Sequence, residues 1–151
     1  MSVVSAEIEV NKNPSSVFEI AKEVDKYPEF MPDIESINVI ERRDDGYARV
    51  SWKAHVKVAS IDKPVKWIED EWWNTENLSS RFELVEGDYK HYFGDWEFTE
   101  TSDGTRVKLT VDYDLGLPLV GPLINKLLDK LVQENLKGML LAIKQKAEGV
   151  I

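Results

Sequence analysis

Two glutamates in one predicted strand are the residues best placed to carry chemistry in this sequence. Glu69 and Glu71 stand two positions apart in the run Trp67-Ile-Glu-Asp-Glu-Trp-Trp73, so in a strand both side chains point to the same face of the sheet. A carboxyl group held against an apolar wall keeps its proton to a higher pH than usual, which suits general acid–base work. The same two groups could instead orient the polar end of a bound molecule.

The composition excludes several other kinds of site. The chain of 151 residues has no cysteine and two histidines, so it has no thiolate zinc site, no cysteine nucleophile and no multi-histidine metal centre. Its 28 acidic and 19 basic residues give a net charge of -9, which disfavours nucleic acid and anionic membranes as partners. No stretch of the sequence is long and apolar enough to span a bilayer. We therefore expect a cytoplasmic protein without metal or cofactor, folded as one domain over residues 1–151.

The glutamates must be positioned by a sheet that is largely antiparallel. Residues 3–10 alternate between apolar and polar, and Asn13-Pro14 then starts a helix that ends before Pro28. Between residues 33 and 115, turn signals separate aromatic and β-branched runs, which predicts six strands in a meander. From Pro122 to about Glu148 apolar residues repeat at helical spacing. The predicted fold class is α+β: a curved seven-stranded antiparallel sheet wrapped around a long C-terminal helix, with a short helical segment between strands 1 and 2.

Hairpin pairing predicts which side chains share the face of the two glutamates, because partners across a hairpin point to the same side. Around a turn at 74–77 the expected partners are Trp73 with Leu78, Glu71 with Ser80, Glu69 with Phe82, Trp67 with Leu84 and, on the other face, Asp70 with Arg81. The other expected pairs are Ala54 with Glu69, Trp52 with Glu71, Phe82 with Tyr92, Ser80 with Gly94, Trp96 with Leu109, Gly94 with Val111 and Tyr92 with Tyr113. The predicted inner face is therefore apolar and aromatic around the two glutamates.

The opposite face is predicted to be charged and solvent-exposed. Its members include Arg49, Lys53, His55, Lys66, Arg81, His91 and Lys108, so both histidines are poor catalytic candidates. The strand at 33–43 is ambiguous, because either Ile34 and Ile40 or Ile37 and Val39 could face inward. A bulge at 44–46 would change its parity.

The predicted inner face carries more polar atoms than a dry core needs. Each inward tryptophan or tyrosine has a polar atom to satisfy, and no inward lysine or arginine faces Glu69 or Glu71. Buried glutamate is rare unless it is paired or solvated. We therefore expect a cavity that holds water or ligand, with Gly94 leaving room between large neighbours. The alternative is that both glutamates lie at the open end of the sheet, in bulk water.

The C-terminal helix also departs from a plain apolar stripe. Asn135 falls in the middle of the stripe near Met139, and Gly138 lies on the same side. Asn135 either bonds a residue of the sheet or contacts a ligand, while Gly138 serves close packing or leaves space. The apolar run 116–122 before the helix is either a loop at the mouth of a cavity or an ordinary buried connection.

Three segments of the chain carry a family resemblance. They are Ala21-Lys-Glu-Val-Asp-Lys-Tyr-Pro-Glu-Phe-Met-Pro32, Glu86-Gly87 with Gly94-Asp-Trp-Glu-Phe98, and Gly104-Thr-Arg-Val107. With the order of elements, they resemble the START-like, helix-grip superfamily, and within it the polyketide cyclase/dehydrase and coenzyme Q-binding START-domain branch. The resemblance implies a curved sheet around a long helix and a hydrophobic cavity for lipids, quinones, sterols or polyketides. It implies cyclisation or dehydration for a minority of members.

Three hypotheses of function follow from these patterns. The first is a non-enzymatic binder or carrier of a hydrophobic small molecule. The second is a polyketide cyclase or dehydratase in which Glu69 or Glu71 is the general acid or base and Tyr92 or Tyr113 polarises a carbonyl. The third is a protein-interaction module that uses the 116–122 loop, with a partner that remains unknown. The residues expected to line the ligand site are Trp52, Ala54, Trp67, Glu69, Glu71, Trp73, Ser80, Phe82, Tyr92, Gly94, Trp96, Val111, Tyr113, Asn135 and Met139.

Overall fold

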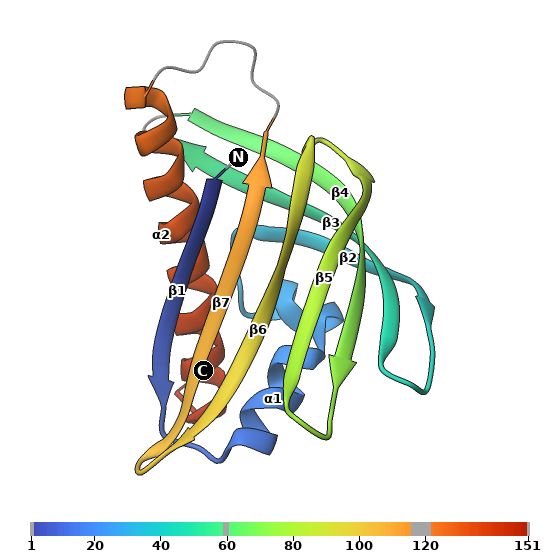
Figure 1. The fold of residues 1–151 in the computed structure, drawn as a ribbon, viewed down its shortest axis with the longest axis vertical. Helices are drawn as coiled ribbons and strands as arrows, with labels where there is room; N and C mark the ends of the chain where they lie inside the picture. Colours follow the sequence, from blue (N-terminus) through green and yellow to red (C-terminus); the bar gives the residue numbers. More distant parts are fainter. Residues whose placement is uncertain (1, 59–60, 116–121, 151) are drawn as a thin grey trace.

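Seven antiparallel strands curve around one long helix in the computed structural model, which describes residues 2–58, 61–115 and 122–150 (Figure 1). The strands lie in the order β1-β7-β6-β5-β4-β3-β2. Their bounds are β1 Ser2–Val10, β2 Ile34–Arg42, β3 Tyr47–Val58, β4 Ile61–Asn74, β5 Ser79–Gly87, β6 His91–Thr101 and β7 Gly104–Asp114. The helices are α1 Pro14–Lys22, the 3₁₀ helix η1 Val24–Glu29 and α2 Pro122–Ala147. This arrangement confirms the predicted fold class.

Helix α1 starts where the sequence predicts and closes one end of the inner face. The Asn13 side chain accepts a hydrogen bond from the Ser16 backbone N–H at 2.9 Å, and Pro14 occupies the first helical position. Phe18 is fully buried and packs edge-on against Trp73 and Phe98, with ring centroids 5.7 and 5.3 Å apart. Helix α1 therefore covers the lower end of the sheet in Figure 1.

The strand register keeps the predicted faces but shifts several predicted partners. The pairs confirmed between β6 and β7 are Trp96 with Leu109, Gly94 with Val111 and Tyr92 with Tyr113. The pairs that replace wrong predictions are Trp73 with Ser80, Glu71 with Phe82, Glu69 with Leu84, Phe82 with Gly94, Ser80 with Trp96, Trp52 with Trp67, and Ala54 with Val65. Leu78 has a positive φ of 49° and belongs to the turn, so β5 begins one residue later than predicted. Each of these slips is an even number of residues and leaves the side chains on their predicted faces. The predicted pair of Trp67 with Leu84 is also wrong, because a bulge between Ile68 and Glu69 pairs Trp67 with Gly87.

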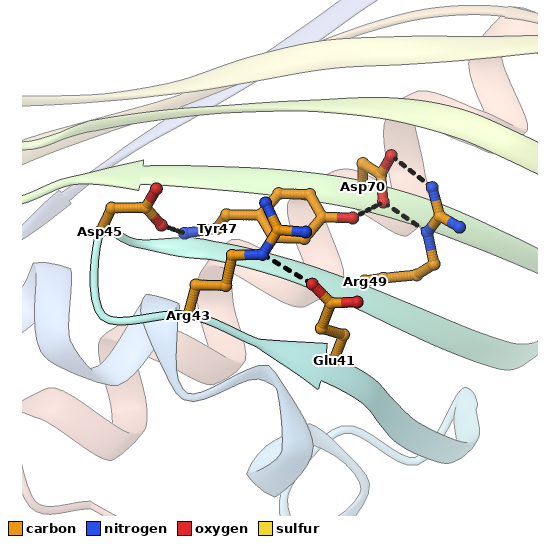
Figure 2. A network of polar contacts seen from close by, with 6 residues as sticks. All are labelled: Glu41, Arg43, Asp45, Tyr47, Arg49 and Asp70. Atoms are coloured by element: carbon orange, nitrogen blue, oxygen red, sulfur yellow. Dashed lines mark hydrogen bonds and ion pairs between the residues drawn. The ribbon is translucent and has the colours of Figure 1, made fainter.

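The predicted ion pair between Asp70 and Arg81 is wrong. Asp70 lies opposite Arg49 of β3 and accepts two hydrogen bonds from its guanidinium, at 2.8 and 3.0 Å, and one from the Tyr47 hydroxyl at 2.7 Å (Figure 2). In the separate pairing of β4 with β5, Arg81 lies opposite Trp72, and its guanidinium carbon is 3.8 Å from the centre of the Trp72 ring. The hydrogen bonds from Arg49, supported by the one from Tyr47, hold the pKa of Asp70 below its ordinary value.

This outer network yields a direct test of the register. Replacing Arg49 by alanine is expected to raise the pKa of Asp70 toward its ordinary value, because the principal donors to the carboxylate are lost. Replacing Arg81 by alanine is the matched control and is expected to leave that pKa unchanged. Carbon-13 NMR titration of the aspartate carboxyl groups measures both effects. A shift of equal size in the Arg81→Ala protein would contradict the observed pairing.

Two bulges resolve the ambiguity of strand β2. The pairing with β3 is interrupted between Ile34 and Ser36 and again between Val39 and Glu41. The first interruption allows Ile34, which is buried, to share the inner side with Ile37 and Val39, which are partly buried. Ile40 is exposed. The parity change therefore occurs within the strand rather than at the predicted turn.

Among the residues of α2 whose side chains the structure describes, only those in the second half of the helix are buried, so the apolar repeat from Pro122 to about Glu148 is not buried along its whole length. Leu136, Leu140 and Ile143 lie in the core, whereas Leu123 is 84% and Leu127 50% exposed. The described residues provide an apolar partner for the stripe only from about Val132 onward. The run 116–122 lies, except for Pro122, outside the described residues. None of the helices in the described part of the chain is long and apolar enough to cross a membrane.

Candidate functional site

Glu69 and Glu71 lie inside the protein. Alternation along β4 turns both side chains to the inner face, where they are only 4% and 2% exposed. Val50 is the β3 partner of Glu69, and Phe82 is the β5 partner of Glu71, so apolar side chains flank both carboxyl groups. The alternative that the pair lies in bulk water at an open end of the sheet is therefore wrong.

Three indole N–H groups hold the two carboxyl groups in place. Trp67 donates to Oε1 of Glu69 at 2.6 Å, Trp73 donates to Oε1 of Glu71 at 3.0 Å, and Trp52 donates to Oε2 of Glu71 at 3.3 Å. Two of these donors stand two residues from their acceptors on β4, while Trp52 comes from β3 and stacks on Trp67 with ring centroids 5.4 Å apart. The tryptophan polar atoms and the glutamate oxygens thus satisfy one another.

Burial raises the pKa of both glutamates. For Glu69 the negative charge of Glu71 and a hydrogen bond between the two carboxyl groups add to the effect of burial, so its pKa lies well above the ordinary value. For Glu71 the hydrogen bonds from Glu69, Trp73 and Trp52 oppose the effect of burial, so its pKa is raised less. The hydrogen bond between the two carboxyl groups couples their titration, and burial favours the protonated form of the pair.

The elevated pKa of Glu69 predicts a specific pH dependence of stability. Above the ordinary carboxyl pKa of 4.5 the folded protein still binds a proton at Glu69 that the unfolded chain has lost. The free energy of unfolding therefore falls as the pH rises toward the elevated pKa, by about 1.4 kcal/mol for each unit of elevation. Glutamine at position 69 cannot titrate, so the free energy of unfolding of Glu69→Gln is expected to decrease less with rising pH. Urea denaturation between about pH 5 and pH 9 measures this dependence.

The exposed Glu83 on the other face of the sheet provides the control for this titration. Glu83→Gln is expected to retain the fall in stability seen in the unmodified protein. The same fall in Glu69→Gln would show that another group is responsible.

A small cavity lies against the carboxyl pair. Its volume is about 30 Å³, enough for one or two water molecules or one small polar group. Ser80 is 5% exposed, and its hydroxyl has no hydrogen-bond partner in the described part of the chain. The residues around this inner cavity are Val24, Tyr27, Trp52, Trp67, Glu69, Glu71, Trp73, Ser80, Phe82, Tyr92, Trp96, Leu109 and Met139.

A larger cleft of about 250 Å³ opens between α2 and the segments around the start of β2 and the end of β3. Asn135 lines it, is partly buried, and has no side-chain hydrogen bond to any residue that the structure describes, so it does not bond the sheet. A Cβ at Gly138 would meet no atom within 4 Å, so this glycine leaves space rather than serving close packing. The walls are formed by Met31, Pro32, Asp33, Ile34, Ala54, His55, Val56, Trp67, Tyr89, Tyr92, Val132, Glu134, Asn135, Leu136, Gly138 and Met139.

One layer of side chains separates the cleft from the inner cavity. Trp67, Tyr92 and Met139 line both spaces. Tyr92 packs against Trp67 and against Tyr89, with ring centroids 5.5 and 4.5 Å apart, and burial raises its pKa well above the ordinary value. Within residues 2–58, 61–115 and 122–150, no three acidic or histidine side chains come together in a way that could hold a metal ion.

Most of the predicted site residues line one of the two spaces, and three do not. Val111 is fully buried in the core away from both. Gly94 leaves no room, because a Cβ there would lie 2.7 Å from the Phe82 ring, so that expectation is wrong. The Tyr113 hydroxyl donates to Oδ1 of Asp129 at 2.7 Å and ties β7 to α2. Tyr113 is therefore engaged in a structural contact.

Several lining residues were not predicted from the sequence, among them Val24, Tyr27, Met31 and Tyr89. They lie in or beside η1 and in the turn between β5 and β6, where strand alternation assigns no face. The Tyr27 hydroxyl donates to the carbonyl oxygen of Ala21, which fixes this buried ring beneath Trp52. The available signal was the segment 27–32, whose two prolines mark a fixed turn next to the sheet.

A curved antiparallel sheet closed over a long C-terminal helix, with space between them, defines a helix-grip, START-like protein. The chain belongs to the family described as polyketide cyclase/dehydrase and lipid transport, which matches residues 10–140. It is similar to a protein of Thermus thermophilus with 35% identity and a TM-score of 0.89 over 99% of both chains. Among curated protein sequences, none is significantly similar.

Two more distant structures share the fold. The Zhui aromatase/cyclase from Streptomyces sp. R1128 has 21% identity and a TM-score of 0.82, over 97% of this chain and 93% of its own. A START superfamily protein from Mycobacterium smegmatis has 19% identity and a TM-score of 0.82 over 99% of both chains. At these identities the similarity is one of fold alone.

Proposed function

We propose that this protein binds a hydrophobic small molecule of the lipid, quinone, sterol or polyketide class in the cleft beside α2, and carries it without chemical change. The cleft itself is the observation that carries the proposal, because its walls are mainly apolar and aromatic with few polar groups, Asn135 among them. Burial of apolar ligand surface supplies the affinity, at roughly 25 cal/mol per Å² before the costs of ordering. Membership of a family that includes lipid transport supports the same proposal.

Native mass spectrometry of the purified protein tests this function. We expect an adduct that organic extraction removes. The extracted protein should then bind at least one of a fatty alcohol, a naphthoquinone and a sterol. Intrinsic tryptophan fluorescence, to which Trp67 beside the cleft contributes, reports the titration. Absence of any adduct together with failure of all three compounds would disprove the proposal.

A polyketide cyclase or dehydratase is the second candidate, favoured by the raised pKa of the buried Glu69 and Glu71 carboxyl pair beside an aromatic cavity. The Streptomyces aromatase/cyclase of the same fold agrees with it. In such an enzyme Glu69 or Glu71 would transfer the proton and Tyr92 would polarise a carbonyl. The geometry disfavours it, because Trp67 and Glu71 already bond Glu69, and the adjoining cavity of about 30 Å³ cannot hold a ring. Loss of turnover with intact binding in Glu69→Gln would favour the enzyme.

A further inference from the structure

The wall of the inner cavity contains the unpaired hydroxyl of Ser80 and the hydrogen-bonded carboxyl groups of Glu69 and Glu71. We infer that it is a subsite for one uncharged hydroxyl group, so that the ligand of the cleft is a neutral alcohol or phenol rather than a carboxylate. This inference rests on the proposed function, since it assigns the polar end of a ligand whose apolar body lies in the cleft.

The hydrogen-bonding capacity of the cavity wall matches a hydroxyl. The Ser80 hydroxyl is buried without a partner in the described part of the chain and can donate one hydrogen bond. Glu71 accepts two indole N–H groups, one on each oxygen, and a hydrogen bond from Glu69, so one of its oxygens retains a further acceptor site. A ligand hydroxyl accepts from Ser80 and donates to a carboxyl oxygen, so it satisfies both. An unpaired buried hydroxyl is otherwise unfavourable.

Charge and size exclude anionic polar ends, and hydrogen-bonding capacity favours a hydroxyl over an ammonium group. Among the residues that the structure describes, no lysine, arginine or histidine lines the cavity, so a ligand carboxylate would lie beside Glu69 and Glu71 without a cation from this part of the chain. An ammonium group carries only donors and leaves the Ser80 proton without an acceptor. A phosphate group is both anionic and too large for about 30 Å³.

Met139 provides the route between the two spaces. Of the three side chains that line both, Trp67 and Tyr92 are held by aromatic neighbours, whereas Met139 is unbranched and rotates easily. Rotation of Met139 joins the cleft to the inner cavity. The apolar body then stays in the cleft while the hydroxyl reaches Ser80.

Three probes that share one apolar body test the inference: 2-naphthol, naphthalene and 2-naphthoate, titrated calorimetrically at pH 7 into ligand-free protein. We expect 2-naphthol to bind at least about tenfold more tightly than either of the others. Equal affinity of 2-naphthol and naphthalene, or tighter binding of 2-naphthoate, would overturn the inference while the proposed function stands. Binding of none of the three overturns the inference, whereas the proposed function is decided by native mass spectrometry and by the fatty alcohol, naphthoquinone and sterol.

The variant Ser80→Ala separates the subsite from the cleft. It is expected to weaken 2-naphthol about five- to tenfold and to leave naphthalene unchanged, because only the hydroxyl contact is removed. The matched control is Ser79→Ala, on the opposite face of β5, where the hydroxyl bonds Asn77. Thermal unfolding verifies that both variants fold. Unchanged 2-naphthol affinity in Ser80→Ala would overturn the inference.

Discussion

Replacing Glu71 by alanine is expected to lower the free energy of unfolding by about 3 kcal/mol. The indole N–H groups of Trp52 and Trp73 both donate to this carboxyl group, and the substitution leaves them buried without an acceptor. Each such unsatisfied donor costs about 1–3 kcal/mol, and the truncated side chain also leaves space in the core. Relief of carboxyl burial offsets part of this loss. Urea denaturation measures the difference.

Two further variants make the Glu71 result interpretable. Glu83→Ala, on the exposed outer face of β5, is expected to change stability by no more than about 0.5 kcal/mol. The free energy of unfolding of Glu71→Gln is expected to lie between those of Glu71→Ala and Glu83→Ala. The glutamine amide oxygen accepts one indole N–H, but its NH₂ group cannot accept the other. If Glu71→Ala is no more destabilising than Glu83→Ala, the indole hydrogen bonds do not stabilise the fold.

Replacing Gly138 by leucine is expected to weaken the binding of naphthalene and 2-naphthol by roughly 100-fold, equivalent to about 2.7 kcal/mol. The new side chain enters the cleft, where a Cβ at this position meets no atom within 4 Å. Leucine is also a better helix former than glycine, by up to about 1 kcal/mol, so the variant is expected to be at least as stable as the parent protein. Calorimetric titration and thermal unfolding measure the two effects.

Gly138→Ala is the matched control for occupancy of the cleft. It has the same benefit for helix α2 but adds only one methyl group, so binding is expected to change by less than about threefold. Parent-like affinity in Gly138→Leu would place the ligand elsewhere and would contradict the proposed function.

The faces of the strands were predictable from the sequence, whereas the partners across each hairpin were not. Alternation along Trp67–Trp73 is enough to place Glu69 and Glu71 on the side of the tryptophans. Register depends on turn length, and the sequence gives no sign that Leu78 joins the turn with a positive φ. As a result Asp70 lies opposite Glu83 of β5, and Arg81 lies opposite Trp72.

The same distinction applies to the residues of the candidate site: those on strands were predictable from the sequence, and those in irregular segments were not. Its strand residues, such as Trp52 and Ser80, follow from alternation, but Tyr27 and Tyr89 come from irregular segments that have no such rule. Gly94 shows a second limit, because a glycine among large side chains is compatible with a void or with close packing. Here the Phe82 ring occupies the space. Packing of this kind depends on three-dimensional neighbours that sequence spacing does not specify.

The pairing of β1 with β7 makes folding depend on contacts between strands that are far apart in sequence. Val4 pairs with Val111 and Ile8 with Val107, so partners lie roughly 100 residues apart in sequence. Contacts this distant slow folding toward the millisecond-to-second range. During synthesis, β1 emerges first and waits roughly 5–20 s for its partner strand. Over that interval its apolar side chains stay uncovered, so the nascent chain is most prone to aggregate before β7 has been made.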